Sequence, residues 1–443
     1  MLVDHLIVKL RGTVAPDPAR FNAVIQRVTA KLTANDSQGQ LGIAHGLYAK
    51  RIMSGGTTLL SLGKKLPVAD ANSLAQTVAA DPDVEYAEPD RRLFARTIPS
   101  DPDYAQQWNL FDSSVGIDLP AAWDLTLGSP SVVTAVIDTG YRPHADFIAN
   151  LLPGYDFITD VDTGNNGRGR GPDATDPGDW VTEQESNDSS GPFYGCVPAD
   201  SSWHGTLTTG LIGAIGNNGI GMAGVNWFSK ILPIRVLGKC GGSTSDIVDA
   251  MRWAAGISVA GVPDNPTPAK ILNLSLGGPG ACSQTFQQAI NEVTGKGVTV
   301  VVAAGNDGVG DGMDSPANCA GVIAVGATDS TGHRAYYSNY GATVTLSAPG
   351  SNILSTSNAG ATTPGIDSFA VYTGTSFAAP QVSGIIGLML SANPRLTPLQ
   401  IAQKLIATAR PSKIPDTSPT ACSEMAPGAG LVDARAAVAA ASN

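Results

Sequence analysis

Hydrophobic and polar positions follow two different patterns along the chain, which divide it near residue 96. The first part mixes strand-like apolar runs with amphipathic helical segments. Strands are predicted at 4–11, 47–53 and 84–89, and helices at 18–33 and 70–80. Asp70 is the expected N-cap of the second helix, because its carboxylate can accept unpaired backbone N–H groups. Residues 1–96 are therefore predicted to form a small α+β domain.

From about residue 117, short runs rich in Val and Ile alternate with helical segments. Strands are predicted at 132–137, 230–237, 270–276, 297–303, 321–327 and 343–347. Helices are predicted at 204–215, 244–257, 283–295, 376–391 and 397–408. This alternation predicts an α/β fold, a doubly wound, mostly parallel sheet with helices on both faces. The second domain is expected to cover residues 97–443, beginning with a Pro-rich linker.

Composition narrows the classes of function. The 443 residues are 42% hydrophobic and 15% charged, which is typical of a globular protein. The formal charge of −11 argues against a nucleic-acid binder and against a polybasic membrane anchor. No run of about 18 apolar residues predicts a membrane span. No secretory signal peptide is visible, because the N-terminus lacks a basic stretch followed by an apolar core.

Residues 156–188 form a Gly-rich insert with nine acidic residues and two basic ones. A long loop inside a compact domain is usually functional or binds an ion. Calcium prefers several carboxylate and carbonyl oxygens at short spacing. The predicted ligands are acidic side chains of this insert: Asp160, Asp162, Asp173, Asp176 and Asp179. A solvated acidic loop is the alternative, and zinc is not expected because no Cys/His cluster accompanies the acids.

Three segments each place a reactive side chain at the end of a predicted element. Asp138 ends an apolar strand, where a parallel sheet binds ligands. His204 begins a helix, where a depressed pKa would keep the imidazole neutral and suited to a general base. Ser376 begins another helix, whose N–H groups favour an oxyanion. Taken singly, each has an ordinary alternative: a turn-capping Asp, a surface His and an N-cap Ser.

A fourth segment adds a possible hydrogen-bond donor. Asn306 follows the buried run Val300–Ala304 and Gly305. Its side chain could donate N–H groups to an oxygen that becomes negatively charged. An Asn in a turn is the alternative reading.

Together the segments resemble the subtilisin-like serine proteases, the subtilase family (peptidase family S8), in its secreted bacterial type with an N-terminal pro-domain. The resemblance rests on three runs: Asp138-Thr139-Gly140, His204-Gly205-Thr206 and Gly374-Thr375-Ser376-Phe377-Ala378-Ala379-Pro380. Their order differs from that of the α/β-hydrolases. It implies a secreted serine endopeptidase that acts through an acyl-enzyme.

The resemblance also implies roles for single residues. Ser376 would attack the peptide carbonyl, His204 would carry the proton, and Asp138 would orient the imidazole. The Asn306 side chain and the Ser376 backbone N–H would form the oxyanion hole. Peptide-binding strands would contain Ser275, Leu276 and Gly277, and Ala303, Ala304 and Gly305.

Asp314 lies in the segment that resembles the floor of the first specificity pocket. An acid at that place would favour Lys or Arg in the substrate. A solvated loop Asp is the alternative.

Further expectations follow from the resemblance. Residues 1–96 would be a pro-domain that assists folding, inhibits the enzyme as an intramolecular partner and is cleaved near 96–100, which makes the chain a zymogen. A permanent accessory domain is the alternative.

The loop 216–222 resembles a calcium loop, with Asn218 and Asp146 as ligands and Gln107 as a third. Protein or peptide substrates and a monomeric state are expected.

Five cysteines are present, and any four of them allow three pairings. Similar spacing in secreted bacterial subtilases favours Cys196–Cys240 and Cys282–Cys319. Cys422 is expected to be unpaired, because Pro427 stands where such relatives tend to carry a second Cys. Disulfides favour an extracellular location.

Two other functions remain as alternatives. The first is a catalytically inactive subtilase fold that serves as a binding or adhesion module. The second is a nucleotide-binding enzyme on the same type of sheet. The nucleotide fingerprint Gly-x-Gly-x-x-Gly does not follow the strand that ends at Asp138.

Overall fold

The computed structural model describes residues 2–12, 17–35, 46–91, 97–310, 314–411 and 428–442. The chain divides into two compact units, Met1–Ala95 and Arg96–Asn443, and each is described by itself. Cys422, which is expected to be unpaired, lies outside the described residues, as does the predicted domain boundary at residue 96.

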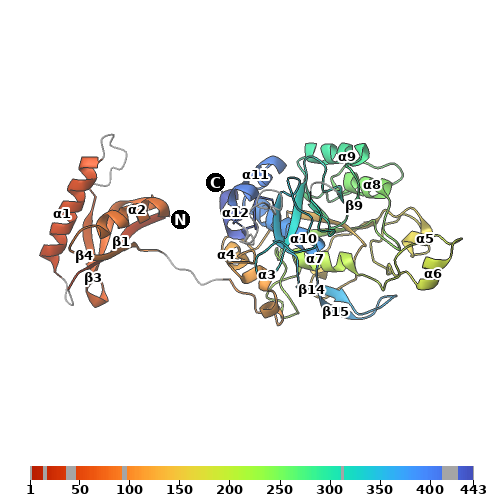
Figure 1. Cartoon of the computed structure of the whole chain (residues 1–443), viewed down its shortest axis with the longest axis horizontal. Coiled ribbons are helices and arrows are strands. Elements are labelled where there is room, and N and C mark those ends of the chain that lie inside the picture. The colour runs from red at the N-terminus through yellow and green to blue at the C-terminus, as the bar shows by residue number, and fades with distance from the viewer. Residues whose placement is uncertain are drawn as a thin grey trace. The chain divides into compact units, whose positions relative to one another are not determined.

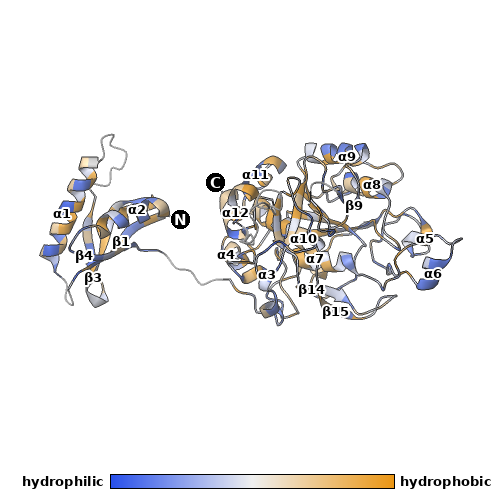
Figure 2. Cartoon of the chain, in the orientation of Figure 1, coloured by the Kyte–Doolittle hydropathy of each residue, from blue (hydrophilic) through white to orange (hydrophobic). Residues whose placement is uncertain are grey.

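The N-terminal unit is a four-stranded antiparallel sheet with two helices (Figure 1). Its elements in chain order are β1 (Leu2–Leu10), α1 (Pro18–Asn35), β2 (Tyr48–Ile52), a 3-10 turn (Ser54–Gly56), β3 (Thr57–Pro67), α2 (Val68–Ala79) and β4 (Val84–Pro89). The strand order is β2-β3-β1-β4. Helix α1 shows mixed hydrophilic and hydrophobic bands in Figure 2, as expected of an amphipathic helix.

Two sequence predictions fail in this unit. Strand β3 was not expected, and its first six residues are all buried. Three of these six residues, Thr57, Thr58 and Ser61, are polar, so the sequence shows neither a continuous apolar run nor an alternation. The predicted N-cap is also wrong, because α2 begins at Val68 after Pro67, and Asp70 lies within the first turn.

The C-terminal unit is built on a seven-stranded sheet, and every pairing in it is parallel. The strand order is β13-β12-β10-β8-β5-β7-β6. The strands are β5 (Val133–Asp138), β6 (Tyr155–Asp156), β7 (Lys230–Arg235), β8 (Ile271–Leu274), β10 (Thr299–Ala303), β12 (Ile323–Thr328) and β13 (Leu346–Pro349). All six predicted strands belong to this sheet. Two small antiparallel pairs accompany it: β9 (Gly278–Pro279) with β11 (Asp314–Ser315), and β14 (Ile353–Asn358) with β15 (Asp367–Tyr372).

All five predicted helices are present, with ends that differ by a few residues. They are α7 (His204–Gly213), α8 (Thr244–Ala254), α9 (Gln284–Gly295), α10 (Thr375–Ala392) and α11 (Pro398–Thr408). The shorter helices were not expected: α3 (Trp108–Phe111), α4 (Leu119–Trp123), α5 (Val161–Gly164), α6 (Glu183–Asn187) and α12 (Ala434–Ala441). Two 3-10 turns, Tyr104–Gln106 and Ile148–Asn150, complete the unit.

Helices cover both faces of the large sheet, which confirms the doubly wound α/β fold. Along β10, Val301 belongs to the core cluster that includes α10, whereas Val300 and Val302 belong to the cluster that includes α8 and α9. Successive side chains of a strand point to opposite faces. Both faces therefore bury apolar residues, as a parallel sheet requires.

Helix α10 is the central helix of one face. It has the length and hydropathy of a membrane span, but 83% of that window is buried inside the unit. Its apolar residues pack against the sheet and α12. It therefore serves as the core helix, and this burial explains its composition.

The strand order reverses at β5, because β7 lies on one side of it and β8 on the other. Ligands of such sheets bind outside the carboxyl ends of the strands at this place. Asp138 is the last residue of β5, and Ser275 follows β8 directly. The topology thus brings these distant segments to one edge.

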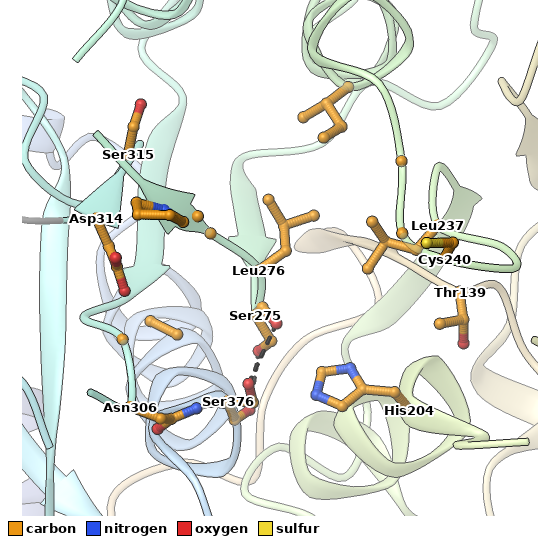
Figure 3. A pocket seen from close by; sticks show the side chains of 18 of the residues that line it. Thr139, His204, Leu237, Cys240, Ser275, Leu276, Asn306, Asp314, Ser315 and Ser376 are labelled. Atoms are coloured by element: carbon orange, nitrogen blue, oxygen red, sulfur yellow. Dashed lines mark hydrogen bonds between the residues drawn. The ribbon is translucent and has the colours of Figure 1, made fainter. Parts of the chain in front are cut away.

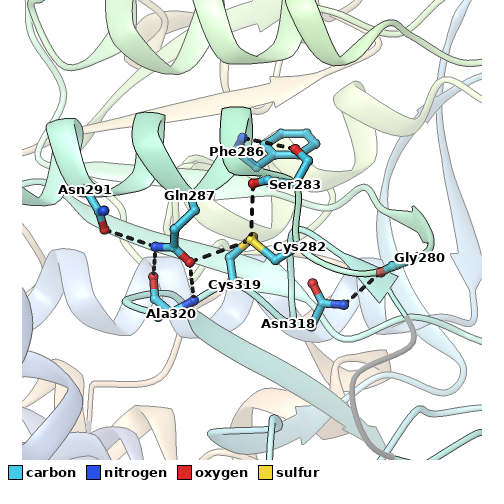
Figure 4. The surroundings of a disulfide bond; sticks show 9 residues. All are labelled: Gly280, Cys282, Ser283, Phe286, Gln287, Asn291, Asn318, Cys319 and Ala320. Atoms are coloured by element: carbon cyan, nitrogen blue, oxygen red, sulfur yellow. Dashed lines mark hydrogen bonds between the residues drawn. A yellow bond between two sulfur atoms is a disulfide. The ribbon is translucent and has the colours of Figure 1, made fainter.

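The structure pairs Cys196 with Cys240 and Cys282 with Cys319, as the resemblance implies. Figure 4 shows the surroundings of the second bond. Gln287 donates from Nε2 to the carbonyl of Ala320 at 2.9 Å and accepts from the Ala320 N–H at 2.8 Å. The segments that carry the two cysteines are therefore held by hydrogen bonds as well as by the disulfide.

A buried ion pair anchors the acidic insert to the sheet. The side chains of Arg235 and Asp156 are both fully buried, and Arg235 Nη1 lies 2.7 Å from Asp156 Oδ2. The other guanidinium nitrogens donate to the carbonyls of Thr139 and Gly164, at 3.1 and 2.7 Å. One arginine therefore connects the insert to the residue that follows Asp138.

Candidate active site

A large pocket lies at the carboxyl edge of the sheet, and Figure 3 shows the side chains around it. Its lining includes His204, Ser376 and Asn306, which are separated by up to 172 positions in the sequence (376 − 204 = 172). Asp138 is fully buried behind His204. The four side chains predicted to act together are thus brought to one place.

The carboxylate of Asp138 is held by several donors. The Thr139 N–H donates to its Oδ1 at 2.7 Å, and the Thr208 hydroxyl donates to its Oδ2 at 3.3 Å. Gly205 lets α7 approach this strand end, because a Cβ there would lie 1.9 Å from the Gly140 carbonyl oxygen. The carboxylate is therefore fixed in position at the start of α7.

The side chains of His204 and Asp138 are joined by a hydrogen bond. Nδ1 of His204 lies 2.8 Å from Asp138 Oδ1 and 3.0 Å from Oδ2. Burial alone would lower the pKa of His204, but the charge and hydrogen bond of Asp138 outweigh it and the pKa is raised. The prediction of a depressed pKa for His204 is therefore wrong. It considered the helix start alone and left out the effect of a carboxylate partner.

Ser376 is the second residue of α10, and its side chain lies near His204. In this structure its hydroxyl donates to the Ser275 carbonyl at 3.2 Å, and Ser275 Oγ donates to the Ser376 carbonyl at 2.8 Å. The imidazole of His204 faces Ser376 (Figure 3). Within the described residues no hydrogen bond joins Ser376 to His204 in this structure, and catalytic hydrogen bonds are often long without substrate.

Asn306 is oriented as an N–H donor to the pocket. Its Oδ1 accepts from the Thr375 N–H at 2.8 Å and from the Thr375 hydroxyl at 2.9 Å. The amide nitrogen Nδ2 is thereby directed away from these partners, toward Ser376 in Figure 3. The Asn306 amide donor and the backbone N–H of Ser376 lie at the same helix start, and such a pair of donors is the arrangement that stabilises an oxyanion.

The predicted peptide-binding residues surround the same pocket, with one exception. The lining residues among them are Ser275, Leu276, Gly277, Ala303 and Gly305. Ala304 is not in the lining, and its carbonyl accepts from Asn339 Nδ2 at 3.0 Å. Asp314 is buried and lines the pocket, so the reading as a solvated loop residue is wrong.

The sequence did not reveal that the acidic insert borders the pocket. Asp179 and Val181 of the insert line it. Val197, Ala199 and Cys240 follow later in the chain and line it too, and the Cys196–Cys240 disulfide holds this wall. Only the tertiary structure shows this contact. Thr208 could have been found, because it stands four residues after His204 on the same face of a helix.

Comparisons with known proteins agree with this geometry. The model of the subtilase family, peptidase S8, matches residues 129–430. The chain belongs to the subtilase family.

Two curated relatives are extracellular enzymes by name. An extracellular protease of Xanthomonas campestris is 47% identical over 91% of this chain, and an extracellular basic protease of Dichelobacter nodosus is 42% identical over 83%. The chain spans 67% and 60% of their own lengths. A solved protease from Pseudoalteromonas arctica PAMC 21717 covers 78% of this chain and 100% of its own, at 47% identity and a TM-score of 0.72.

Membership of a family of serine-type endopeptidases removes the basis for the nucleotide-binding alternative. That alternative rested on the type of sheet alone, and folds of this type serve many functions. The site of this subtilase instead brings together a serine, a histidine and an amide donor.

The first predicted calcium site of this subtilase is not formed. Asp160 caps α5 by accepting from the Thr163 N–H, and Asp162 is exposed in the first turn of that helix. Asp173 pairs with Arg168 at 3.0 Å. In the described ranges, no three acidic, His or Cys side chains lie close enough to hold a metal.

The remaining two acids of that prediction lie nearer to the triad. Asp179 accepts from the Ser202 N–H and hydroxyl, both at 2.7 Å, and lines the pocket. Asp176 is fully buried, and burial followed by the charge of Asp179 raises its pKa to about 7. Both acids help to raise the pKa of His204. These two carboxylates act on the His204 imidazole through their negative charge.

The second predicted calcium pair does come together. Asn218 Nδ2 donates to Asp146 Oδ1 at 2.8 Å, and the Met222 N–H donates to Oδ2 at 3.0 Å. Burial, with smaller contributions from Asp101 and Asp103, raises the pKa of Asp146 to about 6. A buried carboxylate among acids fits a cation. Both ends of the Gln107 amide bond the backbone of Ala223, and the Asn218 amide oxygen likewise accepts from the Ile220 N–H at 2.7 Å.

Proposed function

We propose that the protein is a secreted serine endopeptidase that cleaves proteins or peptides through an acyl-enzyme. The observation that carries this proposal is the convergence of Asp138, His204, Ser376 and Asn306 at one edge of the sheet. Secretion is supported by the extracellular relatives and by the two disulfides.

The proposed reaction uses the described side chains in a fixed order. The Ser376 hydroxyl attacks the peptide carbonyl while His204 takes its proton, and the oxyanion receives hydrogen bonds from Asn306 Nδ2 and the Ser376 N–H. The C–N bond then breaks, and His204 returns the proton to the leaving amine. Water hydrolyses the ester by the reverse sequence of proton transfers. Asp138 orients the imidazole and stabilises its charged form throughout.

An inactive binding or adhesion module is not favoured. Such a module would need only the peptide-binding strands and would not need a carboxylate bonded to His204 at 2.8 Å. A fluorophosphonate probe tests the proposal directly. We expect covalent labelling at Ser376, identified by peptide mass mapping, and no labelling after heating. Correctly folded protein that never labels would favour the binding module.

We propose that residues 1–96 are a pro-domain that inhibits the enzyme until it is cut off, leaving a monomeric protease. The C-terminal unit holds its own first residues firmly. The Thr97 N–H donates to Asp124 at 2.8 Å, and the Ser100 N–H donates to Asn217 Oδ1 at 2.8 Å. Asp101 accepts from the N–H groups of the 217–219 loop. Cleavage at the start of 96–100 would therefore leave a new N-terminus whose first residues are already hydrogen bonded to the rest of the C-terminal unit.

Activity is expected to fall as the pH decreases through a pKa above 6.5, the ordinary value of histidine. The base must be neutral to accept a proton, and Asp138 favours its charged form. Replacing Asp179 by Asn should move the midpoint of kcat/KM against pH downward, because one acid that raises the pKa of His204 is removed. A midpoint unchanged in Asp179→Asn would contradict this account of the electrostatics.

We propose that Asp146 and the 216–222 loop bind a structural calcium ion. Chelation by EDTA should lower the melting temperature of the inactive Ser376→Ala chain, and added calcium should restore it. Calcium at 100 times its Kd would stabilise the fold by about 2.7 kcal/mol. The variant Asp146→Asn should lose this response. An equal response in Asp146→Asn would place the ion elsewhere.

A further inference from the structure

A buried carboxylate in the pocket takes no part in the proposed chemistry. Asp314 is only 6% exposed. Its Oδ2 accepts from Asn339 Nδ2 at 3.1 Å, whereas its Oδ1 has no hydrogen-bond partner among the residues that the structure describes. A buried polar atom without a partner is unfavourable by about 1–3 kcal/mol, and more when it carries charge. This oxygen is therefore available to a ligand that donates a hydrogen bond or brings positive charge.

The carboxylate lies close to the reaction centre. A Cβ on Gly305, which has a φ of +104°, would stand 1.8 Å from Asp314 Oδ2, so the acid lies against this glycine. The Gly305 N–H donates to the Thr375 hydroxyl at 3.2 Å, one residue before Ser376. Asn306 follows Gly305 directly. Asp314 thus belongs to the part of the pocket beside the proposed oxyanion hole, where Figure 3 shows it.

The walls in front of the acid carry little side-chain volume. Gly277 and Gly278 form one side, and a Cβ on Gly278 would meet no atom within 4 Å. Ala303 and Gly305 form the other side. Such walls leave room for a long, unbranched substrate side chain to reach the carboxylate.

Asp314 is also held rigidly. Its strand β11 pairs with β9, Asp314 opposite Pro279 and Ser315 opposite Gly278. A few residues further on, Cys282 and Cys319 join the same two segments (Figure 4). A fixed charge recognises a ligand at a lower entropic cost than a mobile one.

The charge of the acid is not neutralised within the described residues. Burial and then the carboxylate of Asp307 raise the pKa of Asp314, and no cation is among the groups that act on it. Asp307 lines the pocket as an exposed residue. The two acids give this part of the pocket a negative potential that attracts cations.

We infer that this pocket binds a Lys or Arg side chain of the substrate, immediately before the scissile bond, through Asp314. An ammonium or guanidinium group would give the free Oδ1 a charge-assisted hydrogen bond. An apolar side chain would leave that oxygen buried and unpaired, and an acidic one would be repelled. The inference rests on the proposed function and adds the class of substrate.

The test uses the processed enzyme and peptide p-nitroanilides that differ only in the residue before the anilide: Lys, Arg, Leu, Phe or Glu. We expect kcat/KM for Lys and Arg to exceed that for Leu at least about tenfold, with Glu the poorest. In Asp314→Asn the Lys-to-Leu ratio should fall about 100-fold, because the charged partner is lost. Asp314→Ser serves as a second variant should the first fold poorly. Asp264→Asn, an exposed acid outside the pocket, is the matched control and should keep the ratio.

The possible outcomes distinguish a failure of this inference about the substrate from a failure of the proposed protease function. A wild-type preference for Leu or Phe over Lys, or a ratio unchanged in both variants, would overturn the inference while the protease remains. No turnover of any peptide, together with no probe labelling of Ser376, would overturn both.

Discussion

Replacing Ser376 by alanine is expected to abolish peptide hydrolysis and to leave the chain uncut. In the proposed mechanism the Ser376 hydroxyl attacks the peptide carbonyl and gives its proton to His204, so alanine removes both the nucleophile and that proton. A loss of about 10⁶-fold in kcat is the scale found for the nucleophile of subtilisin, a member of the same family, and is adopted here rather than derived from this structure. The residual activity would come from substrate binding and the oxyanion hole.

The measurement combines single-turnover kinetics with intact mass. Uncleaved Ser376→Ala should keep the full 45.3 kDa, whereas the wild-type chain should lose its N-terminal unit. Ser258→Ala is a matched control, because that serine is exposed and does not line the pocket. A Ser376→Ala chain that still cleaves itself, in a preparation free of other proteases, would refute Ser376 as the nucleophile.

Replacing Arg235 by Met is expected to lower the free energy of unfolding by about 3–5 kcal/mol. Both members of the pair with Asp156 are fully buried, so the single change leaves an uncompensated carboxylate inside the unit. Burial already raises the pKa of Asp156 despite the guanidinium. The same change frees the Thr139 carbonyl, so we also expect activity to fall.

Chemical denaturation of the Ser376→Ala chain avoids self-digestion and measures this effect. The double change Arg235→Met with Asp156→Leu should recover most of the loss, since replacing a buried pair by apolar residues is often neutral. Arg168→Met is the matched control, because Arg168 and Asp173 are each about half exposed. That change should cost less than about 1 kcal/mol. Equal losses at Arg235 and Arg168 would contradict the argument from burial.

Prediction from the sequence worked where a pattern is local. The six core strands were found because continuous Val- and Ile-rich runs fill a sheet that is buried on both faces. The five long helices were found from their apolar spacing. Strand β3 was missed, because three of its six buried residues are polar, Thr57, Thr58 and Ser61, and they interrupt the apolar run. The pKa of His204 was predicted in the wrong direction, because it depends on a carboxylate 66 residues away.

The calcium predictions also depend on contacts that a local sequence pattern does not fix. Five acids close together in the sequence were expected to share an ion, yet four of them have different partners, such as the N–H of Thr163 or the side chain of Arg168, and Asp162 is exposed. Proximity along a loop does not fix where side chains point. Asp146 and Asn218, 72 residues apart, do meet, because the resemblance to a family carried information about contacts.

Short runs of residues were enough to predict the family, the layered α/β architecture and the identity of the four candidate reactive residues. The folded structure was needed to show that Asp314 is buried in the pocket with an oxygen that no described residue bonds, that Asp179 and Val181 of the acidic insert line this pocket, and that Arg235 connects that insert to the sheet. The physical reason is that burial and charge pairing arise between segments distant in the chain. The energies of burial and charge pairing depend on which distant segments folding brings together, so no short stretch of sequence reveals them.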